Sequence, residues 1–181
     1  EICNAIQLLK CDLGIIYAYG KILPTKLINI PKHGIINLHC SLLPAYRGAA
    51  PIQHALIDGR DETGITYFEI NDKLDAGKIL LQSKYEISDS DDCESIQASL
   101  TSLAVDHLDS AIKLILKKQY SNSTYTGSIS YANKITKSDS KINTSMNVRQ
   151  LFNRIRALHQ WPCVSIELFG EKIQLIKADV I

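Results

Sequence analysis

Apolar residues cluster in four short segments of the chain, and this pattern predicts β-strands. Residues 13–19 and 34–38 are rich in β-branched side chains and are bounded by Gly and Pro, which is typical of buried parallel strands. Residues 64–70 and 79–87 continue the extended pattern. We therefore expect one sheet in the first half of the chain.

Helical periodicity falls between and after these strands. Pro51 suits the first position of a short helix over residues 51–57, because that position leaves its backbone N–H unpaired in any case. Apolar side chains recur every three or four residues between residues 96 and 115, in a segment that opens with acidic residues. Alternating strands and helices predict an α/β fold, with a doubly wound, mostly parallel open sheet and helices on its faces.

A change of composition predicts a second domain. Residues 119–141 are rich in Ser, Thr, Asn, Tyr and Lys and lack aliphatic periodicity, which is typical of a surface linker. Asn147 is placed to cap an amphipathic helix over residues 148–158, and a hairpin with its turn at Gly170-Glu171 follows. The predicted parts are a first domain (residues 1–118), a linker (119–141) and the start of a second domain (142–181).

The net charge of +1 hides an uneven distribution of charged side chains. Residues 1–112 carry 9 basic and 15 acidic side chains, whereas residues 113–160 carry nine basic side chains and one acidic one. A basic stripe of this kind attracts polyanions. A solvated linker and helix face would have the same composition, so both interpretations stay open at this point.

Composition restricts the class of protein. A chain of 181 residues with 45% hydrophobic content is long enough to bury a core. Its longest apolar runs are too short to span a bilayer and its first residues lack a secretory pattern, so we expect a cytoplasmic protein that does not contact membranes. Five cysteines without a CxxC pair and five histidines without HxxxH spacing predict reduced thiols and no metal site.

Three polar residues are candidates for chemistry. Asn37 and His39 alternate with apolar residues at the carboxyl end of a predicted strand, so both point to one side of the sheet, where open α/β folds bind ligands. Cys40 should point to the opposite side. Asp75 lies in a polar loop after the next strand, and alone it would more often be a turn residue. Together, Asn37, His39 and Asp75 predict one site.

The motifs around these residues resemble a known family. Residues 37–44 read Asn-x-His-x-Ser-Leu-Leu-Pro, and residues 74–77 read Leu-Asp-x-Gly. Both are similar to motifs of the 10-formyltetrahydrofolate-dependent formyltransferases, and the similarity covers nearly the whole chain. The resemblance implies a Rossmann-like formyltransferase domain that lacks the family's amino-terminal strands, followed by the start of a small OB-like β-barrel.

The resemblance also implies a role for each matching residue. Asn37 and protonated His39 would stabilise the oxyanion of a tetrahedral intermediate, and Asp75 would keep His39 charged and assist proton transfer. The co-substrate would be 10-formyltetrahydrofolate, with no metal. Its contacts would come from Ser41, Leu42, Leu43 and Pro44, and the pterin slot would be lined by Lys21, Ile22, Leu23 and Ile70.

The formyl acceptor is open to more than one interpretation. The resemblance is greatest to members that formylate initiator methionyl-tRNA, through residues 47–53 (Arg-Gly-Ala-Ala-Pro-Ile-Gln) and 131–134 (Tyr-Ala-x-Lys). The basic linker and the second domain favour this acceptor, and we expect a monomer. One alternative is a nucleotide amino sugar, because sugar formyltransferases carry a related barrel. Another is a truncated folate- or RNA-binding fragment without catalysis.

Overall fold

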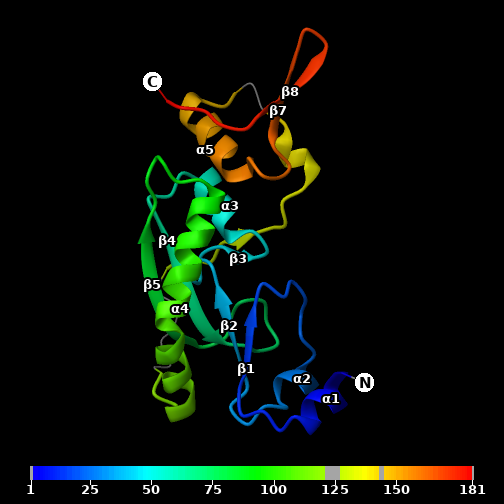
Figure 1. The fold of residues 1–181 in the computed structure, drawn as a ribbon, viewed down its shortest axis with the longest axis vertical. Coiled ribbons are helices and arrows are strands. Elements are labelled where there is room, and N and C mark those ends of the chain that lie inside the picture. The colour runs from blue at the N-terminus through cyan, green and yellow to red at the C-terminus, as the bar shows by residue number, and fades with distance from the viewer. Residues whose placement is uncertain (1, 121–126, 143–144, 181) are drawn as a thin grey trace.

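The computed structural model describes residues 2–120, 127–142 and 145–180 (Figure 1). The helices are α1 (Ile2–Leu8), α2 (Thr25–Ile28), α3 (Pro51–Ile57), α4 (Cys93–Lys117) and α5 (Val148–Leu158), with a 3₁₀ helix over Lys137–Ser140. The strands are β1 (Gly14–Tyr17), β2 (Ile35–His39), β3 (Arg47–Gly48), β4 (Glu62–Glu69), β5 (Ile79–Glu86), β6 (Tyr131–Ala132), β7 (Val164–Leu168) and β8 (Glu171–Leu175). The predicted α/β class is confirmed.

A four-stranded sheet in the order β1-β2-β4-β5 forms the centre of the first domain. β1 and β2 are parallel, as expected, but β4 is antiparallel to both β2 and β5. The described sheet is therefore mixed rather than mostly parallel. Only residues 70–78 join β4 to β5, whereas a parallel pair needs a crossover of about a dozen residues or more.

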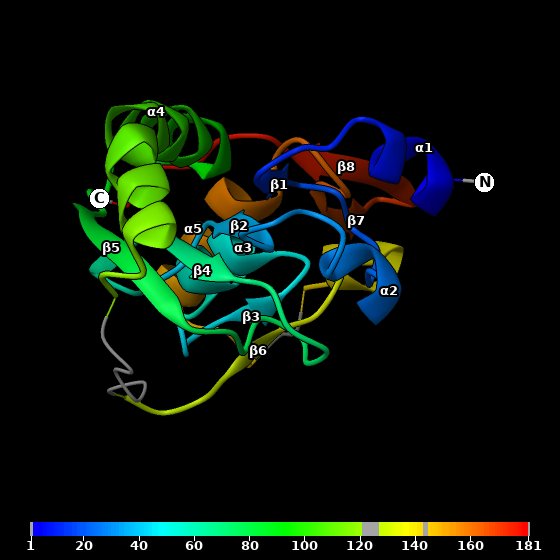
Figure 2. The ribbon, with the colours of Figure 1, turned by 90° about the horizontal axis from the view of Figure 1, so that it is seen from below.

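Helix α4 covers one face of this sheet (Figure 2). Ile36 and Leu38 of β2 are buried in the same apolar cluster as Ile96 and Leu100 of α4. The helix begins at a capping box, in which the side chain of Asp92 accepts hydrogen bonds from two backbone N–H groups of the first turn. The even-numbered side chains of strand β2 thus pack in the core, so its odd-numbered side chains lie on the other face of the sheet.

The predicted linker adds a strand to the first domain. β6 pairs in parallel with β3, and Figure 2 shows both strands on the side of the sheet away from α4. At the start of the linker, the Tyr120 hydroxyl donates to the Glu69 carboxylate at 3.3 Å. Linker residues 121–126 lie outside the described residues. The described part of the linker is therefore anchored to the first domain.

In the predicted second domain (residues 142–181), helix α5 contacts α3 and α4. The Asn147 side chain accepts a hydrogen bond from the backbone N–H of Gln150, so the predicted cap is confirmed. The β7–β8 hairpin turns at Phe169 and Gly170, one residue earlier than predicted, because both have the positive φ that a tight two-residue hairpin turn requires. A helix and a hairpin are consistent with the start of a small barrel, and the domain boundaries stay a prediction.

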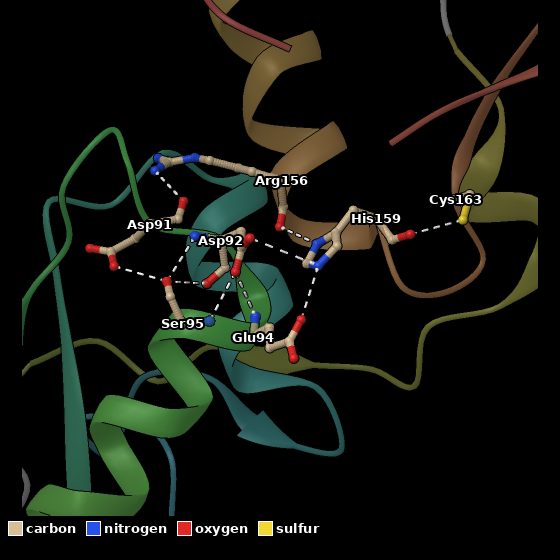
Figure 3. A network of polar contacts seen from close by, with 7 residues as sticks. All are labelled: Asp91, Asp92, Glu94, Ser95, Arg156, His159 and Cys163. Carbon is tan, nitrogen blue, oxygen red and sulfur yellow. Dashed lines mark hydrogen bonds and ion pairs between the residues drawn. The ribbon is translucent and has the colours of Figure 1, made fainter. Parts of the chain in front are cut away.

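Polar contacts join the second domain to the start of α4 (Figure 3). The Arg156 guanidinium donates to the backbone oxygens of Ser88 at 2.7 Å and Asp91 at 3.1 Å. His159 Nε2 lies 3.9 Å from a carboxylate oxygen of Asp92 and 3.9 Å from one of Glu94. The contact between domains is therefore polar as well as apolar.

One further property concerns membranes. Within residues 2–120, 127–142 and 145–180, none of the helices combines the length and apolar character needed to cross a bilayer.

Candidate active site

A cavity of about 590 Å³ opens at the carboxyl end of β2. Its walls come from the segment after β1, the start of α3, the loop between β4 and β5, and β6 with the residues that follow it. Asn37, His39 and Asp75 all line this cavity. The structure therefore brings together the three residues that the sequence predicted to meet.

Strand β2 explains the positions of Asn37 and His39. The two residues are separated by one residue of an extended chain, so their side chains share the face that does not pack in the core. His39 is buried, with 7% of its side chain exposed. The strand thus presents an amide and an imidazole to the cavity from a rigid support.

The hydrogen bonds of His39 define its tautomer. Its Nε2 lies 2.8 Å from the backbone oxygen of Tyr46, and because a carbonyl only accepts, Nε2 carries a hydrogen. Its Nδ1 lies 3.8 Å from Oδ2 of Asp75, whose side chain is 13% exposed. Because Nε2 is occupied by Tyr46, Nδ1 is the ring nitrogen that faces the carboxylate.

Asp75 is positioned by its loop. Its backbone adopts a positive φ of 43°, and its Oδ2 accepts a hydrogen bond of 2.8 Å from the backbone N–H of Gly48. Gly77 lies so close to the backbone of Glu69 that a Cβ atom there would collide with it. The glycine of the Leu-Asp-x-Gly motif therefore lets the loop pass close to β4 and bring Asp75 to the site.

The loop of residues 41–44 lies next to the cavity but does not line it. Ser41, Leu43 and Pro44 are buried, and none of the four residues lines the cavity. The backbone of this loop is bound instead by Thr66, which accepts from the N–H of Leu43 at 3.1 Å and donates to the oxygen of Ser41 at 2.6 Å. Residues 41–44 thus support the site from behind, and their direct contact with folate stays a prediction.

The second group of predicted folate contacts does reach the cavity. Lys21, Ile22, Leu23 and Ile70 all line it. Ile22 is 80% exposed, which leaves its apolar surface available to a flat apolar ring. Their contact with a ligand stays a prediction.

Cys40 follows His39 and also belongs to the lining of the cavity. It packs against the core, and burial raises the pKa of its thiol, an effect only partly offset by a hydrogen bond with Tyr17. A neutral thiol is a poor nucleophile. All five cysteines are free, and among the described residues no cluster of His, Cys, Asp and Glu would hold a metal ion.

Two parts of the site were not predicted from the sequence. The backbone of Tyr46 and the backbone of Gly48 contact His39 and Asp75 respectively. Neither contact uses a side chain, so no residue type could signal it.

Comparisons with known proteins identify the family of the chain. The chain matches the family model "Formyl transferase" over residues 1–112 and the model "Formyl transferase, C-terminal domain" over residues 134–181. It is 42% identical to a methionyl-tRNA formyltransferase from Thermodesulfovibrio yellowstonii, over 98% of this chain and 59% of that protein. The chain spans about three fifths of the length of this relative.

Solved structures share the fold, and at their low identity they bear on the fold alone. A sugar N-formyltransferase from Shewanella sp. FDAARGOS_354 aligns with a TM-score of 0.76 at 22% identity, covering 94% of this chain and 71% of that one. HypX from Aquifex aeolicus, in complex with tetrahydrofolic acid, aligns with a TM-score of 0.79 at 17% identity, covering 95% and 30%. Because the first family model matches more than half of the chain, the protein belongs to the formyltransferase family.

Proposed function

We propose that the protein transfers a formyl group from 10-formyltetrahydrofolate to the amino group of initiator methionyl-tRNA. The observation that carries the proposal is the buried His39–Asp75 pair, which lines one cavity together with Asn37. An amide and an imidazole can donate hydrogen bonds to an oxyanion, and a carboxylate can accept and return a proton, so the three groups suit acyl transfer to an amine. We also infer that the protein acts in the cytoplasm as a monomer.

In the proposed reaction, the neutral amine attacks the formyl carbon and a new C–N bond forms. The oxyanion of the tetrahedral intermediate accepts hydrogen bonds from Asn37 and from Nδ1–H of protonated His39. The separation of 3.8 Å between Nδ1 and Asp75 is longer than a hydrogen bond. The Nδ1–H group therefore faces the carboxylate without donating to it, and it stays available to the oxyanion. Asn37 and His39 thus supply the hydrogen-bond donors for the oxyanion, and the reaction needs no covalent bond between the formyl group and the enzyme.

Proton transfer completes the proposed reaction. The attacking amine loses a proton to Asp75, directly or through a water molecule, and the departing N10 of the folate gains one as its bond to the formyl carbon breaks. Asp75 passes the proton of the amine on to N10, and as a carboxylate, before it takes up this proton and after it releases it, Asp75 is close enough to His39 to balance the charge of the imidazolium.

The donor is inferred from the wall of the cavity and from relatives. Ile22, Leu23 and Ile70 give this wall an apolar surface, and flat heteroaromatic rings bind on such surfaces. HypX, which shares the fold, was solved with tetrahydrofolic acid. These observations support a folate as the formyl donor. We propose its 10-formyl form because the reaction transfers a formyl group.

The acceptor is inferred from charge and from the relative of highest identity described above. Lys21, Lys73 and Lys134 line the cavity, and cations at this position attract a phosphate-bearing acceptor. The relative at 42% identity is named a methionyl-tRNA formyltransferase. A second candidate acceptor is a nucleotide amino sugar, which the shared fold of a sugar N-formyltransferase favours.

The test compares both acceptors with one donor. The protein, expressed from its complete reading frame, is incubated with 10-formyltetrahydrofolate and either charged initiator tRNA or a nucleotide amino sugar, and formylated product is measured. We expect formyl-methionyl-tRNA, and a decrease of about 10²- to 10³-fold in its rate for Asn37→Ala. Formylation of the sugar with charged tRNA left unchanged would contradict the proposed acceptor.

A further inference from the structure

One short loop, residues 44–50, contacts both members of the catalytic pair. The backbone oxygen of Tyr46 accepts from His39 Nε2 at 2.8 Å. Two residues later, the backbone N–H of Gly48 donates to Asp75 Oδ2 at 2.8 Å. A displacement of this loop would therefore change the orientation of the imidazole and of the carboxylate together.

The linker holds this loop in place. The Ser130 hydroxyl accepts a hydrogen bond of 2.9 Å from the backbone N–H of Tyr46, and the Ser130 backbone oxygen accepts one of 2.9 Å from Arg47. Farther along, the backbone oxygen of Ala132 accepts from Ala49 at 2.8 Å. The loop that orients the catalytic pair is thus bound along its length by residues that the sequence assigns to the linker.

The fit between loop and linker leaves little room. Gly48 has a φ of 121°, a conformation that L side chains rarely adopt, and a Cβ atom there would lie 2.6 Å from the backbone oxygen of Ala132. The position therefore requires glycine. Because the two backbones are in close contact, the position of β6 restricts the position of the loop.

A second anchor acts on the far side of the same residue. The Tyr46 hydroxyl donates to Asp58 at 2.8 Å and accepts from Arg60 Nε at 2.8 Å. This anchor holds the side chain of Tyr46, whereas Ser130 holds its backbone, which carries the carbonyl that faces His39. The two anchors can be disrupted separately, so a general loss of structure is distinguishable from a loss of orientation.

We propose that Ser130, in the linker between the domains, is a positioning residue for His39. Its hydroxyl holds the peptide N–H of Tyr46 and so fixes the loop whose carbonyl requires a hydrogen on Nε2 of His39. Nδ1 is then left to face Asp75 and the cavity. The catalytic consequence rests on the formyl-transfer function proposed above, whereas the effect on His39 does not.

The test has one readout that needs no activity. The imidazole nitrogens of His39 are observed by ¹⁵N NMR, with assignment from His39→Gln. In the wild type we expect a hydrogen on Nε2 throughout the pH range in which the protein is folded. In Ser130→Ala we expect exchange between tautomers at high pH, and Ser130→Thr, which keeps the hydroxyl, should restore the wild-type signal.

The kinetic readout separates positioning from binding. For Ser130→Ala we expect kcat to fall about tenfold, the effect of losing one hydrogen bond, with the KM of both substrates changed less than twofold and the pH profile of kcat altered. Ser128→Ala, an exposed serine of the same segment, is the matched control and should resemble the wild type.

Each outcome decides the proposal. An unchanged His39 spectrum and an unchanged kcat in Ser130→Ala would overturn it. An equal effect of Ser128→Ala would also overturn it, because the effect would then belong to the segment and not to the hydroxyl. If the wild type transfers no formyl group, the proposed function fails, and the spectrum still decides whether Ser130 positions His39.

Discussion

Two histidines of this protein face carboxylates in similar ways but in different surroundings. His39 directs Nε2 to the backbone oxygen of Tyr46 and Nδ1 to Asp75 at 3.8 Å. His159 directs Nδ1 to the backbone oxygen of Arg156, one turn back in its own helix, at 3.2 Å, and its Nε2 to the carboxylates at the start of α4. In both cases a carbonyl determines which nitrogen carries a hydrogen, and the other nitrogen meets the negative charge.

The difference between the two pairs lies in what surrounds the carboxylates. Asp75 is 13% exposed and lines a cavity of about 590 Å³, whereas Asp92 and Glu94 are 41% and 71% exposed at the contact between domains (Figure 3). Charges in a shielded cavity interact more strongly than charges in contact with water. A histidine beside a carboxylate is therefore not by itself a sign of catalysis, and the cavity decides.

The largest expected effect is on the rate of formyl transfer, and it distinguishes the His39–Asp75 pair from the pair of His159 and Asp92. Asp75→Asn removes the charge beside His39 and keeps a similar shape, so we expect formyl transfer to fall about 10²- to 10⁴-fold, the usual range for loss of an acid or base. Asp92→Asn makes the same change at the domain contact and should alter the rate less than threefold. Steady-state kinetics of both variants, with thermal unfolding to verify the fold, measures this. Equal losses in the two variants would contradict the distinction drawn here.

The next effect separates charge from hydrogen bonding at Asp92. Its side chain accepts from the backbone N–H groups of Glu94 and Ser95 at the start of α4. Asp92→Ala should lower the free energy of unfolding by about 1 kcal/mol, because an N-cap is lost, while Asp92→Asn should lower it much less, because asparagine is an equally good cap. Denaturant unfolding of the two variants gives both values. A larger loss of unfolding free energy in Asp92→Asn than in Asp92→Ala would show that the charge facing His159 contributes more to stability than the N-cap.

Much of this site follows from the sequence, for a physical reason. Asn37 and His39 lie two residues apart in a strand, and a period of two places their side chains on one face whatever the rest of the fold does. The helix over residues 51–57 was also predicted, because proline at the first position is a local signal. Asp75 was harder to place, since its loop reaches the site only through tertiary structure.

What the sequence did not reveal depends on backbone groups and on packing. The contacts of Tyr46 and Gly48 with His39 and Asp75 use main-chain atoms, which every residue carries. The antiparallel pairing of β4 was missed because apolar runs look alike in parallel and antiparallel strands.

A smaller effect is expected for the histidine at the domain contact. His159→Gln removes the imidazole that faces Asp92 and Glu94, and pairs at 3.9 Å with exposed carboxylates contribute at most about 1 kcal/mol. We expect a loss of less than that in the free energy of unfolding and a change of less than twofold in the rate of formyl transfer. Unfolding at two salt concentrations provides the control, since the loss should shrink at high salt. A strong loss of activity would place His159 in the catalytic machinery.

The smallest effect is a dependence of stability on pH at the same contact. Burial tends to raise the pKa of Asp91, but hydrogen bonds from the backbone and hydroxyl of Ser88 and from the hydroxyls of Ser95 and Tyr85 outweigh it and lower the pKa. A lowered pKa in the folded state means that this carboxylate stabilises the protein above the ordinary aspartate pKa of about 3.9. The contribution is lost as the pH falls from there through the folded-state pKa. Asp91→Asn should therefore lose stability less steeply than the wild type between about pH 5 and pH 3, as measured by unfolding at a series of pH values. Identical slopes would mean that the carboxylate of Asp91 contributes nothing through its charge, and that the polar contacts at this end of α4 act through geometry alone.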